Sequence, residues 1–133
     1  MLFNLFKRKN KNSMLSQTET QWNKMWDLWA EGEIASPYNE LMNYQSEVNN
    51  GGHSQYFINT ENNGDLSGEM SALAEILPLT LSQNLKNAYR AHLLSEEDEN
   101  NEEAEAVLEK CDEMFFEAEE KINSILENFC KML

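Results

Sequence analysis

Basic residues are scarce in this chain, and the few present are unevenly placed. Ten lysines and arginines stand against 24 aspartates and glutamates, which gives a formal net charge of −14. Four of the ten lie among the first eleven residues, at Lys7, Arg8, Lys9 and Lys11. The rest of the chain should therefore repel nucleic acid and attract basic protein surfaces. Many soluble proteins are equally acidic, so charge alone leaves plain solubility open as well.

Cysteine and histidine are also rare. Cys111 and Cys130 fall on one predicted helix, and nineteen residues at 1.5 Å each place them about 28 Å apart, beyond disulfide reach. We expect two reduced thiols and a cytoplasmic protein. Neither His53 nor His92 has a second histidine or a cysteine at ligand spacing, so the sequence predicts no metal site and no cofactor.

Long apolar runs and catalytic motifs are missing. No segment approaches the ~20 apolar residues that span a membrane. Residues 1–6 are largely apolar, but they are too few for a signal-peptide core and the basic residues follow them. No G-x-S-x-G, phosphate-binding glycine loop, CxxC or HExxH occurs. Pairs of carboxylates mean little in so acidic a chain, and we therefore expect no enzymatic activity.

The sequence does contain strong helical periodicity. Trp22, Met25, Trp26 and Trp29 recur at spacings of three and four, which predicts an aromatic helix face. Residues 60–68 are polar and glycine-containing and favour a surface loop. Pro78 should end the following helix, and Thr80 with Gln83 forms the pattern of a capping box for the next. We predict an all-α domain of about six helices over residues 13–133, preceded by a basic arm at residues 1–12.

The last predicted helix, from about Glu102 to Leu133, is long and amphipathic. Its apolar residues fall within an arc of ~120° at 100° per residue. They are Ala104, Val107, Leu108, Cys111, Met114, Phe115, Ala118, Ile122, Ile125, Leu126, Phe129 and Leu133. Six acidic residues outside this arc are the candidate partner-binding residues: Glu105, Glu109, Asp112, Glu113, Glu119 and Glu120. Like charges at i, i+4 cost a few tenths of a kcal/mol each, so a one-sign face favours a basic partner.

Residues 47–59 are the most distinctive segment. Two asparagines and two glycines interrupt a helical pattern after Val48, and glycine is the natural residue for a helix break. Gln55 and Asn59 lie one turn apart if the chain then resumes a helix. Amides among aromatics either join a turn to the core or line a pocket, and the sequence leaves both open.

The pattern E-V-N-N-G-G-x-x-Q-Y-F-x-N in this segment resembles the hallmark of a bacterial family, that of the Neisseria-type DNA mimic protein. The resemblance implies an all-helical fold and a dimer that occupies the DNA-binding face of a transcription regulator. The family-typical residues map to Glu47, Asn49, Gly51, Gly52, Gln55, Tyr56 and Asn59. His53 departs from the aromatic or aliphatic residue expected at its position.

Two functions are consistent with these features. The first is an acidic protein-interaction module that imitates DNA, because carboxylates at i and i+4 on a helix match the spacing of about 6–7 Å between phosphates of one strand. The second is a small-molecule or peptide-binding protein that uses a pocket at residues 47–59. A filled turn with a continuous acidic ridge would favour the first function. A polar cavity beside Glu47 and Gln55 would favour the second.

Overall fold

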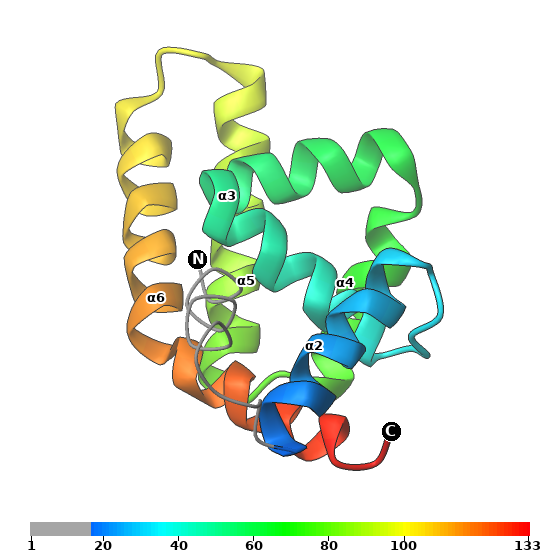
Figure 1. The fold of residues 1–133 in the computed structure, drawn as a ribbon. Helices are drawn as coiled ribbons and strands as arrows, with labels where there is room; N and C mark the ends of the chain where they lie inside the picture. Colours follow the sequence, from blue (N-terminus) through cyan, green and yellow to red (C-terminus); the bar gives the residue numbers. More distant parts are fainter. Residues whose placement is uncertain (1–16) are drawn as a thin grey trace.

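The described part of the chain, residues 17–133 of a computed structural model, contains five α-helices and no strand. They are α2 (Gln17–Ala30), α3 (Tyr38–Asn63), α4 (Leu66–Ile76), α5 (Leu79–Glu97) and α6 (Glu102–Cys130) (Figure 1). The predicted all-α class is confirmed. The basic arm at residues 1–12 lies outside the described residues. Within them, no helix combines the length and apolar character that crossing a membrane requires.

Helix α3 is sharply kinked at the two glycines. Gly51 has φ −159° and ψ 18°, and Gly52 has φ +80° and ψ −178°, so neither continues the α-helix. Figure 1 shows the two halves of α3 meeting at this kink beside α6. The predicted break is thus confirmed. The halves on either side of the kink were expected as separate helices; counted together as α3, they leave five helices in the described residues against the expected six.

Helix α3 packs against three other helices, α4, α5 and α6. Its residues Leu41, Tyr44, Val48 and Phe57 are completely buried. The most extensive helix–helix contact is between α5 and α6, which are joined by a short connection and run antiparallel (Figure 1). The core therefore lies where α3 crosses the α5–α6 pair.

The apolar stripe of α6 largely faces this core, as predicted. Leu108, Phe115, Ile122 and Leu126 are buried. The prediction is wrong for three members of the arc, because Val107 is 42%, Met114 is 47% and Leu133 is 41% exposed. Leu133 lies beyond the end of α6 at Cys130. Val107 and Met114 lie at the edge of the arc, where they line a groove between α5 and α6.

The predicted loop at residues 60–68 is also wrong. Helix α3 continues to Asn63, and only Gly64 and Asp65 separate it from α4. The Asp65 side chain accepts a hydrogen bond from the backbone N–H of Gly68 at 3.0 Å and so caps α4. Polar residues remain helical here because buried Tyr56 and Phe57 anchor the turn before them, and tertiary packing outweighs weak propensity.

The start of α5 differs from the predicted capping box. Pro78 occupies the N-cap position with φ −54° and ψ 151°, and no side chain caps the helix. Thr80 is already inside the first turn, and both Thr80 and Gln83 are exposed. The fixed φ of proline suits a helix start, so the helix begins before the threonine can cap it.

Candidate protein-interaction surface and motif turn

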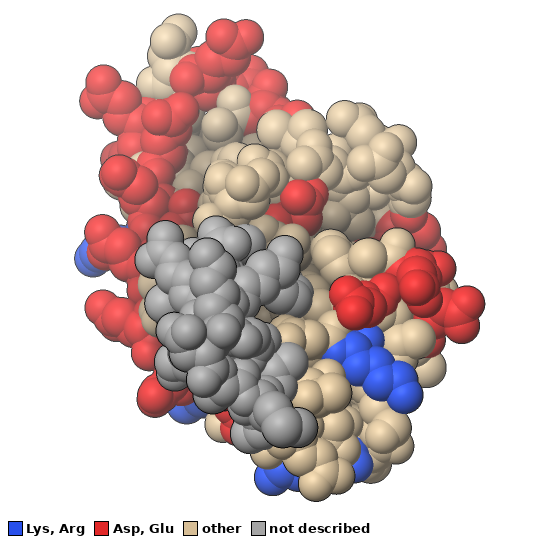
Figure 2. All heavy atoms as spheres, in the orientation of Figure 1, with Lys and Arg blue, Asp and Glu red and all other residues tan. Residues whose placement is uncertain are grey.

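A row of acidic side chains runs along α6. Glu105, Glu109 and Glu113 follow one another at i, i+4 spacing and are all exposed, as is Glu120 further along. Figure 2 shows acidic side chains extending along the α6 edge of the molecule from the α5–α6 connection. Two lysines of α6, Lys110 and Lys121, are its sole basic residues. We call Glu105, Glu109 and Glu113 the acidic ridge; it presents three carboxylates to solvent, with Lys110 at its edge beside Glu113.

Two of the predicted partner-binding residues point elsewhere. Asp112 Oδ1 accepts a hydrogen bond from the His53 backbone N–H at 2.9 Å and lies 2.6 Å from His53 Nδ1. Glu119 Oε2 accepts from Gln45 Nε2 at 3.0 Å and from Asn49 Nδ2 at 2.6 Å. Both carboxylates are half-buried and face α3. They join α6 to α3, whereas the acidic ridge lies on the solvent side.

The motif turn is filled. A Cβ added at Gly52 would lie 2.5 Å from Asp112 Oδ2, and one added at Gly51 would collide with the Gln55 side chain. Gly52 therefore allows the backbone of α3 to approach α6 closely enough for Asp112 to bond His53, whereas Gly51 leaves room for the Gln55 side chain of α3 itself. Left-handed φ at Gly52 adds a second reason for glycine there.

His53, the departure from the family pattern, is completely buried and fully bonded. Its Nε2 lies 2.6 Å from the Tyr44 hydroxyl and its Nδ1 faces Asp112. The ring also packs edge-to-face with Phe115 of α6 at 6.2 Å between centroids. Burial, with the nearby Cys111 and Asp112 charges next in importance, raises the pKa of the Tyr44 phenol, which thus stays protonated. The histidine completes a polar contact inside an aromatic cluster.

Tyr56 of the motif belongs to a polar network that joins α3 to α2 and α4. The Trp29 indole donates to Asn43 at 2.8 Å, and Asn43 donates to Glu69 Oε2 at 2.9 Å. The Tyr56 hydroxyl donates to Glu69 Oε1 at 2.9 Å. Burial raises the pKa of the Glu69 carboxyl, and the hydrogen bonds from Asn43 and Tyr56 oppose that rise. Glu69 lies outside the motif, and nothing in the sequence around it predicted that it would accept these two hydrogen bonds.

A hollow of about 300 Å³ lies beside this network. Glu47 and Asn59 of the motif line it together with Asn63 and Glu69. Gln55 does not line it; its amide donates to Glu47 Oε1 at 3.1 Å. The motif thus combines a filled turn, in contact with α6, with a small polar hollow that α3 lines together with Trp29 of α2 and Glu69 of α4.

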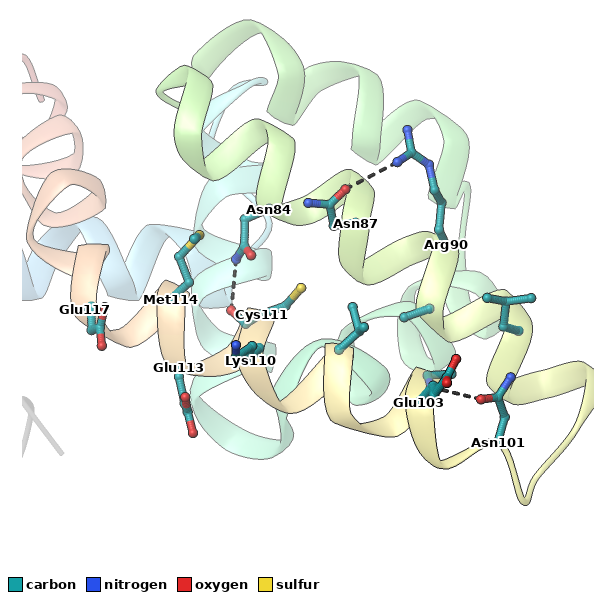
Figure 3. Close-up of a pocket in the computed structure, with 14 residues that line it drawn as sticks. Asn84, Asn87, Arg90, Asn101, Glu103, Lys110, Cys111, Glu113, Met114 and Glu117 are labelled. Carbon is teal, nitrogen blue, oxygen red and sulfur yellow. Dashed lines mark hydrogen bonds between the residues drawn. The ribbon is translucent and has the colours of Figure 1, made fainter.

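A larger groove of about 750 Å³ is lined by side chains of both α5 and α6 (Figure 3). Its floor contains Cys111, whose carbonyl accepts a hydrogen bond from Asn84 at 2.9 Å. Exposed Val107 and Met114 form its apolar wall, and Glu113 of the acidic ridge lies at its edge. Sequence reasoning placed Val107 and Met114 in the core, so it missed a groove with acidic and apolar sides next to each other.

The comparisons with known proteins yield one match. The family described as DMP19-like protein matches residues 38–132. This range covers the motif turn, the acidic ridge and the groove, and it leaves out α2. No curated protein and no solved structure matches the chain.

Proposed function

Because the chain belongs to the DMP19-like protein family, we propose that it is an acidic protein-interaction module that occupies the DNA-binding face of a basic partner protein. The single observation that carries the proposal is the exposed acidic ridge. Its partner class is a transcription regulator or another DNA-binding protein. The module itself binds no nucleic acid, because its charge repels phosphate.

The geometry of the ridge supports imitation of a phosphate strand. Residues four apart on a helix rise about 6 Å along its axis, close to the spacing of about 6–7 Å between phosphates of one strand. Glu105, Glu109 and Glu113 form such a row, and Glu117 extends it. A side chain that bridges two phosphates on DNA therefore meets two carboxylates at a similar separation.

The α5–α6 groove supports a protein partner rather than a mere counter-ion atmosphere. Protein interfaces combine a small apolar centre with a polar rim, and the apolar contacts supply much of the binding energy. Val107 and Met114 offer that centre, and Glu113 belongs to both ridge and groove. A basic partner can thus place arginines on the ridge and an apolar side chain in the groove.

The test is capture of partner proteins from the source cells by three immobilised forms of the full chain at low salt. These are the wild type, a ridge variant (Glu105→Lys, Glu109→Lys, Glu113→Lys) and a control variant (Glu31→Lys, Glu33→Lys, Glu75→Lys). All six positions are exposed, so both variants change net charge equally and should fold. Asp112 is left intact because it bonds His53.

We expect the wild type and the control variant to retain the same DNA-binding protein and the ridge variant to lose it. Like-charge contacts against a basic surface cost several kcal/mol, which corresponds to more than a hundredfold in affinity. If both variants lose the DNA-binding protein equally, its capture depends on net charge and not on the acidic ridge. Recovery of no DNA-binding protein by the wild type would contradict the proposal.

The family resemblance also suggests a homodimer, which belongs to this proposal as its oligomeric state. Sedimentation of the full chain at tens of micromolar tests it. A monomer at that concentration would contradict the dimer. The proposal for the acidic ridge would stand, because the ridge is formed by a single chain.

The polar hollow beside Glu47 and Asn59 favours a second candidate, a binding site for a small polar molecule. Its volume stands at the lower limit of ligand pockets, and the groups around it already bond one another. If it binds a ligand, a screen of polar metabolites by thermal unfolding should find one whose stabilisation disappears in Asn59→Ala. Partner capture should be unchanged in that variant, which separates the two functions.

A further inference from the structure

One of the two histidines has an unsatisfied nitrogen. His92 of α5 is only 3% exposed, and its Nε2 has no hydrogen-bond partner within the described residues. An unsatisfied buried polar atom costs about 1–3 kcal/mol, and native structures contain few of them. The nitrogen therefore calls for a ligand or a role.

Aromatic packing fixes the orientation of this ring. The centroid of the Phe57 ring lies 5.1 Å from that of His92, and Phe57 is itself completely buried. Tyr89, one turn before His92 on α5, packs on the same Phe57 ring at 5.3 Å. The imidazole is therefore held in place before any ligand arrives, which lowers the entropy lost on binding.

Two carboxylates converge on this nitrogen from different helices. Glu96 follows His92 by one turn of α5, and its Oε1 lies 3.3 Å from Nε2. That is longer than the 2.7–2.9 Å typical of a charge-assisted N–H···O bond, and the contact fails hydrogen-bond geometry although it is within ion-pair reach. Glu61, from the second half of α3, is the third residue of the cluster. One carboxylate oxygen of Glu61, one ring nitrogen of His92 and one carboxylate oxygen of Glu96 all lie within 4.8 Å of one another.

We propose that Glu61, His92 and Glu96 bind one divalent transition-metal ion, with Zn²⁺ the best fit. Donors bound to tetrahedral zinc at about 2.0 Å lie about 3.3 Å from one another. The Nε2–Oε1 distance already matches that separation, and Glu61 and Glu96 are exposed, so their carboxylates close the remaining gap by side-chain rotation. Water completes the fourth position.

The donor set selects the metal. One imidazole and two carboxylates suit zinc and its first-row neighbours, whereas Mg²⁺ and Ca²⁺ prefer sites made of oxygen alone. Burial raises the pKa of the Cys111 and Cys130 thiols, so neither cysteine readily becomes the thiolate that would compete for zinc. The bound ion would neutralise two carboxylates and tie α3 to α5.

The test is zinc titration of the metal-free full chain at pH 7 by calorimetry, with three variants of exposed glutamates. Glu61→Gln and Glu96→Gln each remove a ligand, and Glu97→Gln is the matched control one residue outside the site. Far-UV circular dichroism verifies that each variant is folded. We expect one equivalent of zinc to bind the wild type and Glu97→Gln, and both ligand variants to lose at least tenfold in affinity.

A second readout reports on the histidine itself. The ring-nitrogen NMR signals of His92 should shift on zinc addition, while those of His53, whose two nitrogens face Tyr44 and Asp112, should stay. If the wild type binds several equivalents of zinc and all three variants bind fewer by the same amount, the zinc binds generally to an acidic surface, and the proposed site is overturned. Absence of binding, wild-type affinity in either ligand variant or an unmoved His92 signal would overturn it too.

Discussion

Gly52 offers the sharpest test of how the motif turn is held against α6. Replacing it by alanine acts in two ways. Its φ of +80° with ψ −178° lies in a region that is essentially restricted to glycine, which costs about 1–3 kcal/mol for any other residue. The new Cβ would also lie 2.5 Å from Asp112 Oδ2, and Asp112 must then leave the His53 backbone N–H.

The second effect is the loss of the hydrogen bond between Asp112 and the His53 backbone N–H. A hydrogen bond to a charged group contributes about 1.5–3 kcal/mol. With the backbone strain, Gly52→Ala should therefore lower the free energy of unfolding by about 2.5–6 kcal/mol. Against a total stability of about 5–15 kcal/mol, this is a severe loss.

Two other glycines serve as matched controls. Gly32 has φ +76°, but a Cβ there would meet nothing within 4 Å, so Gly32→Ala should show only the strain of a left-handed backbone, about 1–2 kcal/mol. Gly64 has φ −176° and its nearest neighbour would be 3.9 Å away, so Gly64→Ala should be close to neutral. The three variants thus separate strain from collision.

The assay is urea unfolding followed by tryptophan fluorescence. We expect the loss of stability to be largest for Gly52→Ala, smaller for Gly32→Ala and smallest for Gly64→Ala. If Gly52→Ala and Gly32→Ala differ by less than about 0.5 kcal/mol, Asp112 does not hold the turn as described.

Three further outcomes follow from the described contacts. The pKa of Glu69 is raised in the folded protein, so the native state binds this proton more readily than the unfolded chain does. The contribution of Glu69 to stability therefore falls as the pH rises from the usual pKa of 4.5 through the raised pKa. Unfolding measured at a series of pH values should show a shallower fall of stability in Glu69→Gln than in the wild type. His53→Phe should cost about 2–4 kcal/mol in urea unfolding, because the buried Tyr44 hydroxyl loses its partner and the Asp112 carboxylate keeps only the backbone N–H of residue 53; a neutral result would show that the aromatic cluster suffices. Met114→Asp should leave the melting temperature within a few degrees of wild type, because Met114 is 47% exposed, yet weaken partner capture at least tenfold; unchanged capture would exclude the groove from the interface.

Periodicity and backbone chemistry made much of the fold predictable. The apolar stripe of α6 has the helical repeat, and most of its members are buried. The break at Gly51 and Gly52 followed from the conformational freedom of glycine, and it lies where expected. These features depend on local sequence, which is why local reasoning found them.

Features that depend on a second helix were not predictable. A helical wheel put Asp112 and Glu119 with the other acids of α6, yet α3 approaches on that flank and bonds both. On the opposite flank α5 leaves a groove, so Val107 stays exposed although it belongs to the apolar arc. The Glu61 carboxylate reaches His92 through the packing of α3 on α5, and no sequence spacing encodes that approach.

Competition with duplex DNA tests the central claim most directly. A partner retained by the immobilised full chain would be titrated with double-stranded DNA that the partner recognises, at fixed salt and with the ridge variant as the reference. If the acidic ridge occupies the DNA-binding face, DNA and this protein must exclude each other, so the apparent affinity of the partner for the chain should fall in proportion to the DNA added. Formation of a ternary complex, with the partner holding DNA and this protein at once, would contradict it.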